Sequence, residues 1–300
     1  MPAIKNVALV SAAGGLGTTV LKHVVASGAF NVTAIRRKGS KSKYPAGIKV
    51  VDVDVESVED LTAALKGQDA VISLVGIPAL AGQTKIIDAA IAAGVHRFLP
   101  SDFGTDIDTE LTRKLPVFGY KVQVVDYLIQ KARETSLTYT LVSNGAFLDW
   151  GLEQNFLLNT SEYKPAIYDG GNTVFSATTL ASVGDAVVGI LKHPDETKNR
   201  RVYVDNIKTT QNRLLALAEK VAPNKPWAPE QVSIDTLTKA SDEKLAKGDF
   251  APENFISYIF RALFDPAYKP DFAKTDNELL GIKPVDEDAV LDILKKVIKQ

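Results

Sequence analysis

Hydrophobic residues in the first hundred positions alternate between two patterns. Short β-branched and apolar runs predict strands, and helical patterns lie between them. The predicted strands are Val7–Val10, Val32–Ile35, Val50–Val53, Ala70–Leu74 and Arg97–Leu99, and the predicted helices run from about Gly15 to Ser27, near Val58 to Leu65, and from Gly82 to Ala93. This alternation predicts an α/β fold, in which a doubly wound parallel sheet carries helices on both faces.

Two of the strand-like runs suggest which strands lie at the centre of that sheet. The residues from Asn6 to Val10 and from Ala70 to Leu74 are apolar without alternation, as expected for strands covered on both sides. The α/β pattern continues with one long helix over about Leu111 to Thr135 and a strand over Tyr139 to Val142.

Beyond Asn144 the pattern changes, because aromatic residues and prolines become denser. We expect a nucleotide-binding domain over residues 1–155, to which a segment near 174–206 returns. The remainder, mainly residues 156–300, is expected to form a smaller C-terminal α+β substrate lobe. It would cover the carboxyl ends of the strands, where ligands bind in open α/β sheets.

A stretch of small residues follows the first strand and opens the first helix. It contains Ser11, Ala13, Gly14, Gly15, Leu16 and Gly17. Residues without a Cβ let backbone N–H groups approach a pyrophosphate at the positive end of a helix, so we assign these six residues to cofactor binding. A fully glycine-spaced loop would carry glycine at position 11, and the serine is expected to alter the turn slightly. A turn that only packs helix against strand is the alternative.

The end of the second strand distinguishes NADP from NAD. The strand ends in Arg36 and Arg37, and no acidic residue lies between Asn31 and Val51. A ribose 2′-phosphate would therefore meet cations there, and an arginine can grip it at two points. We predict NADP(H) as the cofactor; a solvated basic loop is the alternative.

Composition narrows the partner classes. The chain of 300 residues has a formal net charge of −1, so no overall basic field favours nucleic acid or an anionic membrane. No run reaches the roughly 18 apolar residues that a membrane span needs, and no targeting signal is recognised, so we expect a cytoplasmic protein. The absence of cysteine excludes thiolate chemistry, and the three separated histidines lack metal-ligand spacing. We predict a small-molecule partner and no metal; a homodimer stays open.

Lys121 is the candidate catalytic residue. Short-chain dehydrogenases commonly set tyrosine and lysine four apart at the start of the helix after the fifth strand, and here Val117 occupies the tyrosine position before Lys121. The pair Tyr127 and Lys131 has the required offset, but Lys131 lies about 15 Å further along the helix. Desolvation and a nearby cation can bring a lysine pKa toward roughly 7 to 8. A lysine that only binds the nicotinamide ribose is the alternative.

The segment Arg97 to Gly104 reads RFLPSDFG and resembles the RFLPSEFG signature of the isoflavone reductase-like group of NmrA-like atypical short-chain dehydrogenases. Gln83, Lys121, the segment Tyr139 to Phe147 and the segment Asn277 to Gly281 also match that family's pattern. The resemblance implies a Rossmann-type domain, NADPH as reductant, and Lys121 as general acid or base beside an aromatic substrate. Ser11 and Asp102 depart from the family's usual glycine and glutamate.

Four further residues complete the predicted cofactor site: Gln83, Ser101, Asn144 and Phe147. Ser101 stands where short-chain dehydrogenases place a serine against substrate or cofactor, and a helix or loop cap is the alternative. Phe147 follows the sixth strand and could wall the nicotinamide, although aromatic residues in such places are also ordinary core.

Together these features predict an NADPH-dependent reductase of a small aromatic or phenolic substrate, of the phenylpropanoid or isoflavone kind. Hydride would come from the nicotinamide, while Lys121 protonates or deprotonates the adjacent oxygen. The alternative is a non-catalytic NmrA-like protein that senses NADP(H) and regulates a partner. The presence of Lys121 favours the enzyme.

Overall fold

The structure is a computed structural model that describes residues 3–298, and seven parallel strands form its main sheet. Their spatial order is β10-β6-β5-β4-β1-β2-β3. The strands are β1 (Asn6–Val10), β2 (Asn31–Arg37), β3 (Lys49–Val53), β4 (Ala70–Ser73), β5 (Arg97–Leu99), β6 (Thr138–Ser143) and β10 (Arg200–Tyr203). The chain winds outward in both directions from β1, which confirms the predicted doubly wound α/β fold.

Helices cover both faces of this sheet and enclose two hydrophobic cores. One face carries α2 (Val58–Leu65), α3 (Gln83–Ala92) and α5 (Gly119–Glu134), and the other carries α1 (Gly15–Ala26) and α7 (Leu180–Lys192). All four residues of β4 are buried, and β1 and β4 are neighbours at the centre. Their continuous apolar sequence is thus explained by cover on both sides.

The prediction of one long helix over about Leu111 to Thr135 is wrong in its first part. The structure has a short helix α4 (Glu110–Arg113), a 3-10 turn η2 (Pro116–Phe118) and then α5. Pro116 cannot donate the backbone hydrogen bond that a continuous helix needs, and it pushes Leu115 to an extended conformation with ψ of 128°. Lys121 consequently lies in the first turn of α5.

The rest of the chain builds smaller sheets and a third hydrophobic core. One sheet has the order β11-β9-β7, from Ile207–Thr209, Phe175–Thr178 and Ala146–Phe147, and the other pairs β12 (Glu230–Val232) with β8 (Ala166–Tyr168). The remaining helices are α6 (Leu148–Glu153), α8 (Gln211–Val221), α9 (Ile234–Ala246), α10 (Ile256–Phe264), α11 (Asn277–Leu280) and α12 (Glu287–Val297), and the 3-10 turns are η1 (Ile77–Ala79), η3 (Pro252–Phe255) and η4 (Pro266–Tyr268). The lobe boundary at residue 155 stays a prediction.

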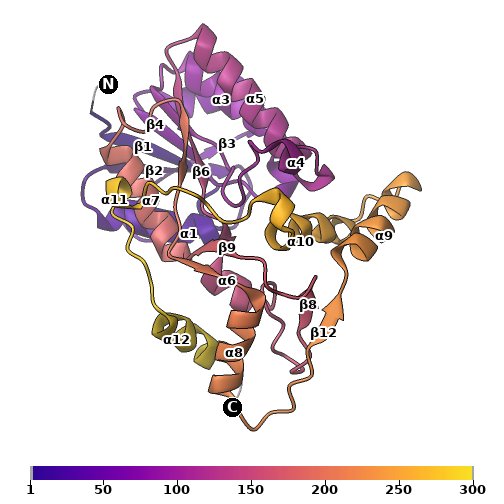
Figure 1. Ribbon diagram of the computed structural model, residues 1–300. Coiled ribbons are helices and arrows are strands. Elements are labelled where there is room, and N and C mark those ends of the chain that lie inside the picture. Colours follow the sequence, from indigo (N-terminus) through magenta and orange to yellow (C-terminus); the bar gives the residue numbers. More distant parts are fainter. Residues whose placement is uncertain (1–2, 299–300) are drawn as a thin grey trace.

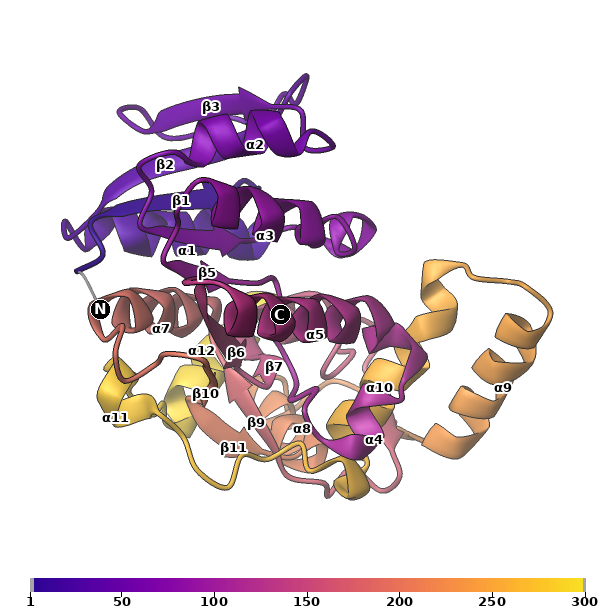
Figure 2. The same cartoon turned by 90° about the horizontal axis from the view of Figure 1, so that it is seen from above.

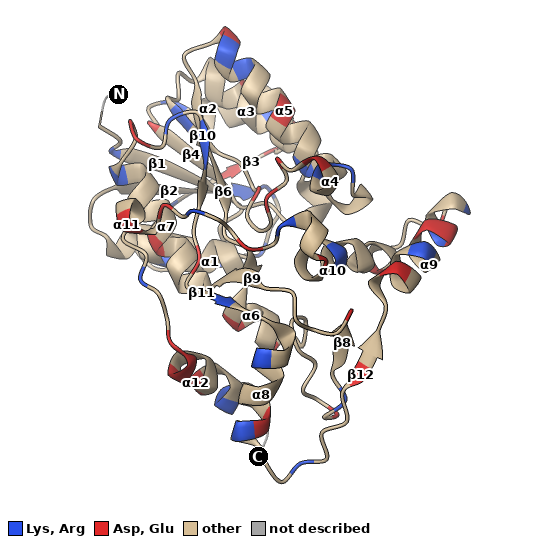
Figure 3. Ribbon diagram, in the orientation of Figure 1, with Lys and Arg blue, Asp and Glu red and all other residues tan. Residues whose placement is uncertain are grey.

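Figures 1 and 2 show how these parts are arranged. The main sheet and its helices form one side of the molecule, α8 and α12 lie together away from it, and α9 projects outward. Acidic and basic segments occur together along α9 and α12 (Figure 3). Among the described residues, no helix combines the length and apolar character needed to cross a membrane.

Candidate functional site

The small-residue loop after β1, Ser11 to Gly17, which is called the phosphate loop below for its predicted role, places its serine in an unusual backbone conformation. Ser11 has φ of +62°, a region that favours glycine, and its N–H donates to the Ile35 carbonyl at 3.1 Å. Sequence reasoning expected serine to alter this turn, but Ser11 instead occupies the left-handed conformation, which costs an L residue about 1–2 kcal/mol. Gly17 is required for packing, since a Cβ there would lie 2.9 Å from Ala12 Cα.

A cavity of about 530 Å³ lies above this loop, at the carboxyl ends of the central strands. Nine of the predicted residues line it, namely Ser11, Ala13, Gly14, Gly15, Leu16, Gly17, Arg36, Arg37 and Ser101. The lining is completed by Ser40, Ser42, Tyr44, Leu74, Val75 and Gly76, which the sequence analysis did not assign. The cavity therefore combines a helix N-terminus with two arginines and five hydroxyl-bearing side chains, a set of groups suited to phosphate.

Arg36 is held by a carboxylate that sequence reasoning missed. Its Nε and Nη2 donate to the two oxygens of Asp52 at 2.6 and 2.9 Å, and its Nη1 donates to the Ser42 carbonyl at 2.7 Å. The hydrogen bond to Asp52 raises the pKa of Arg36, and the same bond lowers the pKa of Asp52. The signal was the sheet register, which sets Arg36 opposite Asp52 on β3. Arg37, in contrast, is exposed at the cavity.

Gln83 and Ser101 lie together at the end of β5. The Ser101 N–H donates to Gln83 Oε1 at 2.7 Å, and the Ser101 hydroxyl donates to the Val75 carbonyl at 2.8 Å. Gln83 is buried and does not line the cavity. The glutamine thus braces the loop that presents Ser101.

Asn144 and Phe147 do not line the cavity. Asn144 lies against the loop that follows β5. Asn144 Oδ1 accepts from the Gly104 N–H at 2.8 Å, and the Asn144 N–H donates to the Gly104 carbonyl at 3.0 Å. Gly104 has φ of +124°, a conformation that side chains rarely adopt. Phe147 is half-buried against the core between the sheet and α7. These contacts fix the path of the loop that contains Asp102 and Phe103.

Lys121 reaches this same loop from α5. Its Nζ donates to the Phe103 carbonyl at 2.6 Å. Burial lowers the pKa of Lys121; the carboxylate of Asp102 opposes this shift, and the guanidinium of Arg201 adds to it. Because Ser101 lines the cavity and Phe103 holds the amine, three consecutive residues connect the cavity to Lys121.

Beneath Lys121 lies a buried ion pair that sequence reasoning also missed. Arg201, on β10, donates from Nη1 to Asp102 Oδ2 at 2.7 Å, and the two side chains are only 3% and 2% exposed. No local motif signals Arg201, because it reaches the site through the pairing of β10 with β6. The family signature marks position 102 as acidic, and that was the available signal for Asp102.

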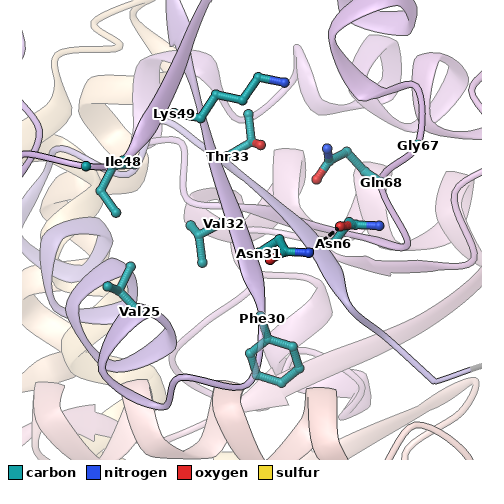
Figure 4. Close-up of a pocket in the computed structure, with 11 residues that line it drawn as sticks. Asn6, Val25, Phe30, Asn31, Val32, Thr33, Ile48, Lys49, Gly67 and Gln68 are labelled. Carbon is teal, nitrogen blue, oxygen red and sulfur yellow. Dashed lines mark hydrogen bonds between the residues drawn. The ribbon is translucent and has the colours of Figure 1, made fainter.

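A second cavity of about 530 Å³ contains none of the predicted residues (Figure 4). It is lined by residues near the amino ends of β1, β2 and β3, among them Asn6, Asn31 and Lys49. Asn31 Nδ2 donates to Asn6 Oδ1 at 3.0 Å in its lining. Ligands of doubly wound sheets bind at the opposite, carboxyl edge, so we assign the site to the cavity above the phosphate loop.

Comparison with known proteins agrees with this geometry. The model of the NmrA-like family matches residues 4–259. "Oxidoreductase poxI" of Penicillium oxalicum is 33% identical over 294 residues, covering 93% of this chain and 90% of that protein. "Oxidoreductase aprR" of Aspergillus flavus is 36% identical over 296 residues, covering 97% and 99%.

Solved structures share the fold across the whole chain. One is described as "AtPrR2 with NADP+ and (+)pinoresinol", with a TM-score of 0.78 at 20% identity, covering 99% of this chain and 100% of that one. Another is a leucoanthocyanidin reductase–NADPH complex from Vitis vinifera, with a TM-score of 0.77 at 20% identity, covering 98% and 99%. The family inferred from the RFLPSDFG motif is confirmed: this chain belongs to the NmrA-like family.

Proposed function

We propose that this protein is an NADPH-dependent reductase in which Lys121 handles the proton. The observation that carries the proposal is the link between cavity and amine: Ser101 lines the cavity, and the Phe103 carbonyl binds Lys121 Nζ. A dinucleotide in the cavity would therefore have a lysine with a lowered pKa near one end. A lowered pKa makes a lysine a better general acid or base than a lysine in water.

The residues around the cavity fit NADPH. The helix N-terminus at Gly14 and Gly15 would hold the pyrophosphate, and the loop after β2 would hold the 2′-phosphate. Arg37 would supply the charge, because Arg36 already donates to Asp52 and Ser42. Two solved relatives described as NADP+ or NADPH complexes support this cofactor.

The chain's own residues would position and protonate the substrate. The bound nicotinamide would supply the hydride. Lys121 would give a proton to, or take one from, the substrate oxygen beside the reduced carbon. Its hydrogen bond to Phe103 fixes where the amine lies, and Asn144 and Gly104 fix the Phe103 loop.

We propose a small aromatic or phenolic substrate. A relative named "Phenylcoumaran benzylic ether reductase IRL1" of Ginkgo biloba is 27% identical over 297 residues, which supports this class. Aromatic rings of the C-terminal part also support it, since Phe260 on α10 lies 4.5 Å from Tyr168 and 5.0 Å from Phe156, centroid to centroid. Helix α10 packs against η2, immediately before the helix that carries Lys121.

Turnover tests this function directly. The purified protein would be given NADPH with a panel of phenolic ethers, enones and quinones, and NADPH oxidation would be followed at a fixed pH. We expect consumption with at least one substrate, and a loss of 100-fold or more in Lys121→Ala, in line with general acid–base contributions of roughly 10² to 10⁴. Lys114→Ala is the matched control, because Lys114 is exposed and pairs only with Glu110 among the interactions described.

Two results would contradict the proposal. Full activity in Lys121→Ala would remove the lysine from the mechanism. Tight NADPH binding without turnover on any substrate of the panel would instead support the regulatory alternative.

A further inference from the structure

Asp102 is a buried carboxylate whose two oxygens differ in their hydrogen bonding. The residue is 1% exposed, its Oδ2 accepts from Arg201, and its Oδ1 has no hydrogen-bond partner among residues 3–298. Burying a carboxylate is costly unless charge and hydrogen bonds compensate for the lost hydration. A half-satisfied carboxylate directly before the residue that holds Lys121 calls for a functional explanation.

Arg201 is fixed from its other side by a second set of carboxylates. Its Nε and Nη2 donate to the two oxygens of Asp108 at 2.8 and 3.0 Å, and its Nε lies 3.4 Å from Asp106. Its Nη1 also donates to the Ser143 hydroxyl at 3.0 Å. Tyr203 in turn donates to Asp106 at 3.0 Å. The guanidinium therefore has little freedom to leave Asp102.

We propose that Asp102 and Arg201 are positioning residues for Lys121, in which the carboxylate places a negative charge beside the ammonium and the guanidinium holds that carboxylate in place. This inference rests on the proposed role of Lys121. It extends the site beyond Lys121 to a group of charged side chains, called the positioning layer below. Arg201 lies on β10, Asp102 lies in the loop after β5, and Lys121 lies in the first turn of α5. Neither Asp102 nor Arg201 is placed in contact with substrate or cofactor.

The charges in this layer act on Lys121 in opposite directions. Burial lowers the pKa of Lys121, Asp102 from the β5 loop raises it, and Arg201 from β10 lowers it. The pKa of Asp102 is raised, because the effect of burial outweighs the opposing charges of Arg201 and Lys121. Burial alone would lower the pKa of Arg201, but Asp102, Asp108 and Asp106 together raise it. These opposing effects together set the pKa of Lys121. Loss of Asp102 would lower that pKa, because the charge that raises it would be gone.

Competitive acetylation measures that balance without any substrate. The full-length protein, with and without NADP+, would be labelled with trace acetic anhydride across a pH series, and mass spectrometry would give the titration midpoint of Lys121. In Asp102→Asn we expect the midpoint to fall by about one pH unit or more, the usual size of an effect from one close charge. In Asp108→Asn, which removes an outer carboxylate with a 43% exposed side chain, we expect a smaller fall.

Asp126→Asn is the matched control, because Asp126 lies on the same helix as Lys121 but pairs at the surface with Arg113. Its midpoint should equal that of the wild type. If Asp102→Asn folds and leaves the Lys121 midpoint unchanged, the proposal is overturned. If Asp102→Asn does not fold, equal midpoints in Asp108→Asn and Asp126→Asn overturn it.

The outcome is separable from that of the proposed function. If Asp102→Asn shifts the Lys121 midpoint but the protein never oxidises NADPH, the positioning role of Asp102 and Arg201 stands and the reductase function is rejected. If turnover depends on Lys121 but the midpoint does not shift in Asp102→Asn, the reductase function stands and the positioning role is rejected.

Discussion

Ser11 holds a backbone conformation that ordinarily selects glycine. Its φ of +62° places Cβ close to the backbone, which costs about 1–2 kcal/mol for an L residue. Ser11→Gly would release this strain, partly offset by the greater freedom of glycine in the unfolded chain. We expect the free energy of unfolding to rise by about 1 kcal/mol, measured by urea denaturation without nucleotide.

The neighbouring Ala13 provides a control for that substitution. It lies in the same loop, but its φ is not positive. Ala13→Gly should lower the free energy of unfolding by about 0.5–1 kcal/mol, since only the unfolded chain gains freedom. Equal destabilisation by both substitutions would contradict the strain argument.

The two arginines at the end of β2 should differ in their effects on cofactor binding. Arg37 is exposed at the cavity, so Arg37→Gln should weaken NADPH by about 10-fold or more and leave NADH unchanged, because only the 2′-phosphate loses a partner. Arg36 also anchors the Ser42 carbonyl and pairs with Asp52, so Arg36→Gln should weaken both nucleotides. Fluorescence titration of the wild type and the two variants gives the six dissociation constants. Equal wild-type affinity for NADPH and NADH would rule out recognition of the 2′-phosphate by these arginines.

At the scale of elements, Gly17 decides how closely α1 approaches the loop that follows β1. A Cβ at Gly17 would meet Ala12 Cα at 2.9 Å and the Ser11 carbonyl oxygen at 3.0 Å. Gly17→Ala should therefore force α1 away and lower the free energy of unfolding by about 1–3 kcal/mol, as overpacking typically does. NADPH affinity should fall as well, because the phosphate loop moves with the helix.

Gly15→Ala separates packing from binding within the same loop. In the part of the chain that the structure describes, nothing lies within 4 Å of a Cβ at Gly15, which lines the cavity at the start of α1. We expect the free energy of unfolding to rise by about 0.4–1 kcal/mol, because alanine has less freedom than glycine in the unfolded chain. NADPH binding should weaken, because the methyl group would obstruct the approach of a phosphate. Thermal denaturation together with nucleotide titration checks both variants; a stable Gly17→Ala protein would refute the packing argument.

The sequence predicts those parts of the site that are contiguous in the chain. The loop from Ser11 to Gly17 could be recognised because strand, turn and helix follow one another. Asp52 could not, since its role depends on the register that sets it opposite Arg36. The same limit applies to α5, where helical periodicity continued through Pro116 and concealed the break that places Lys121 in a first turn.

At the scale of the whole molecule, the return of the chain to the main sheet completes the buried layer beneath Lys121. After β6 the chain forms β7, β9 and α7, and only then adds β10 beside β6. This pairing brings Arg201 to Asp102, 99 positions away along the sequence. No local pattern encodes such a contact, so sequence analysis identified Lys121 but not the pair that surrounds it.

Hydrogen exchange over the whole chain would show which of the two cavities binds the nucleotide. Connections after β1, β2, β4 and β5 converge on the cavity above the phosphate loop, whereas the other cavity borders the strands' amino ends. With NADPH at 100 times its dissociation constant, amides near Ser11–Gly17, Arg36–Tyr44 and Leu74–Gly76 should exchange up to about 100-fold more slowly where opening requires release of the nucleotide. Helix α9, which projects from the body, should be unaffected and serves as the internal reference. Protection confined to Asn6, Asn31 and Gln68 would place the nucleotide at the opposite edge and overturn the site.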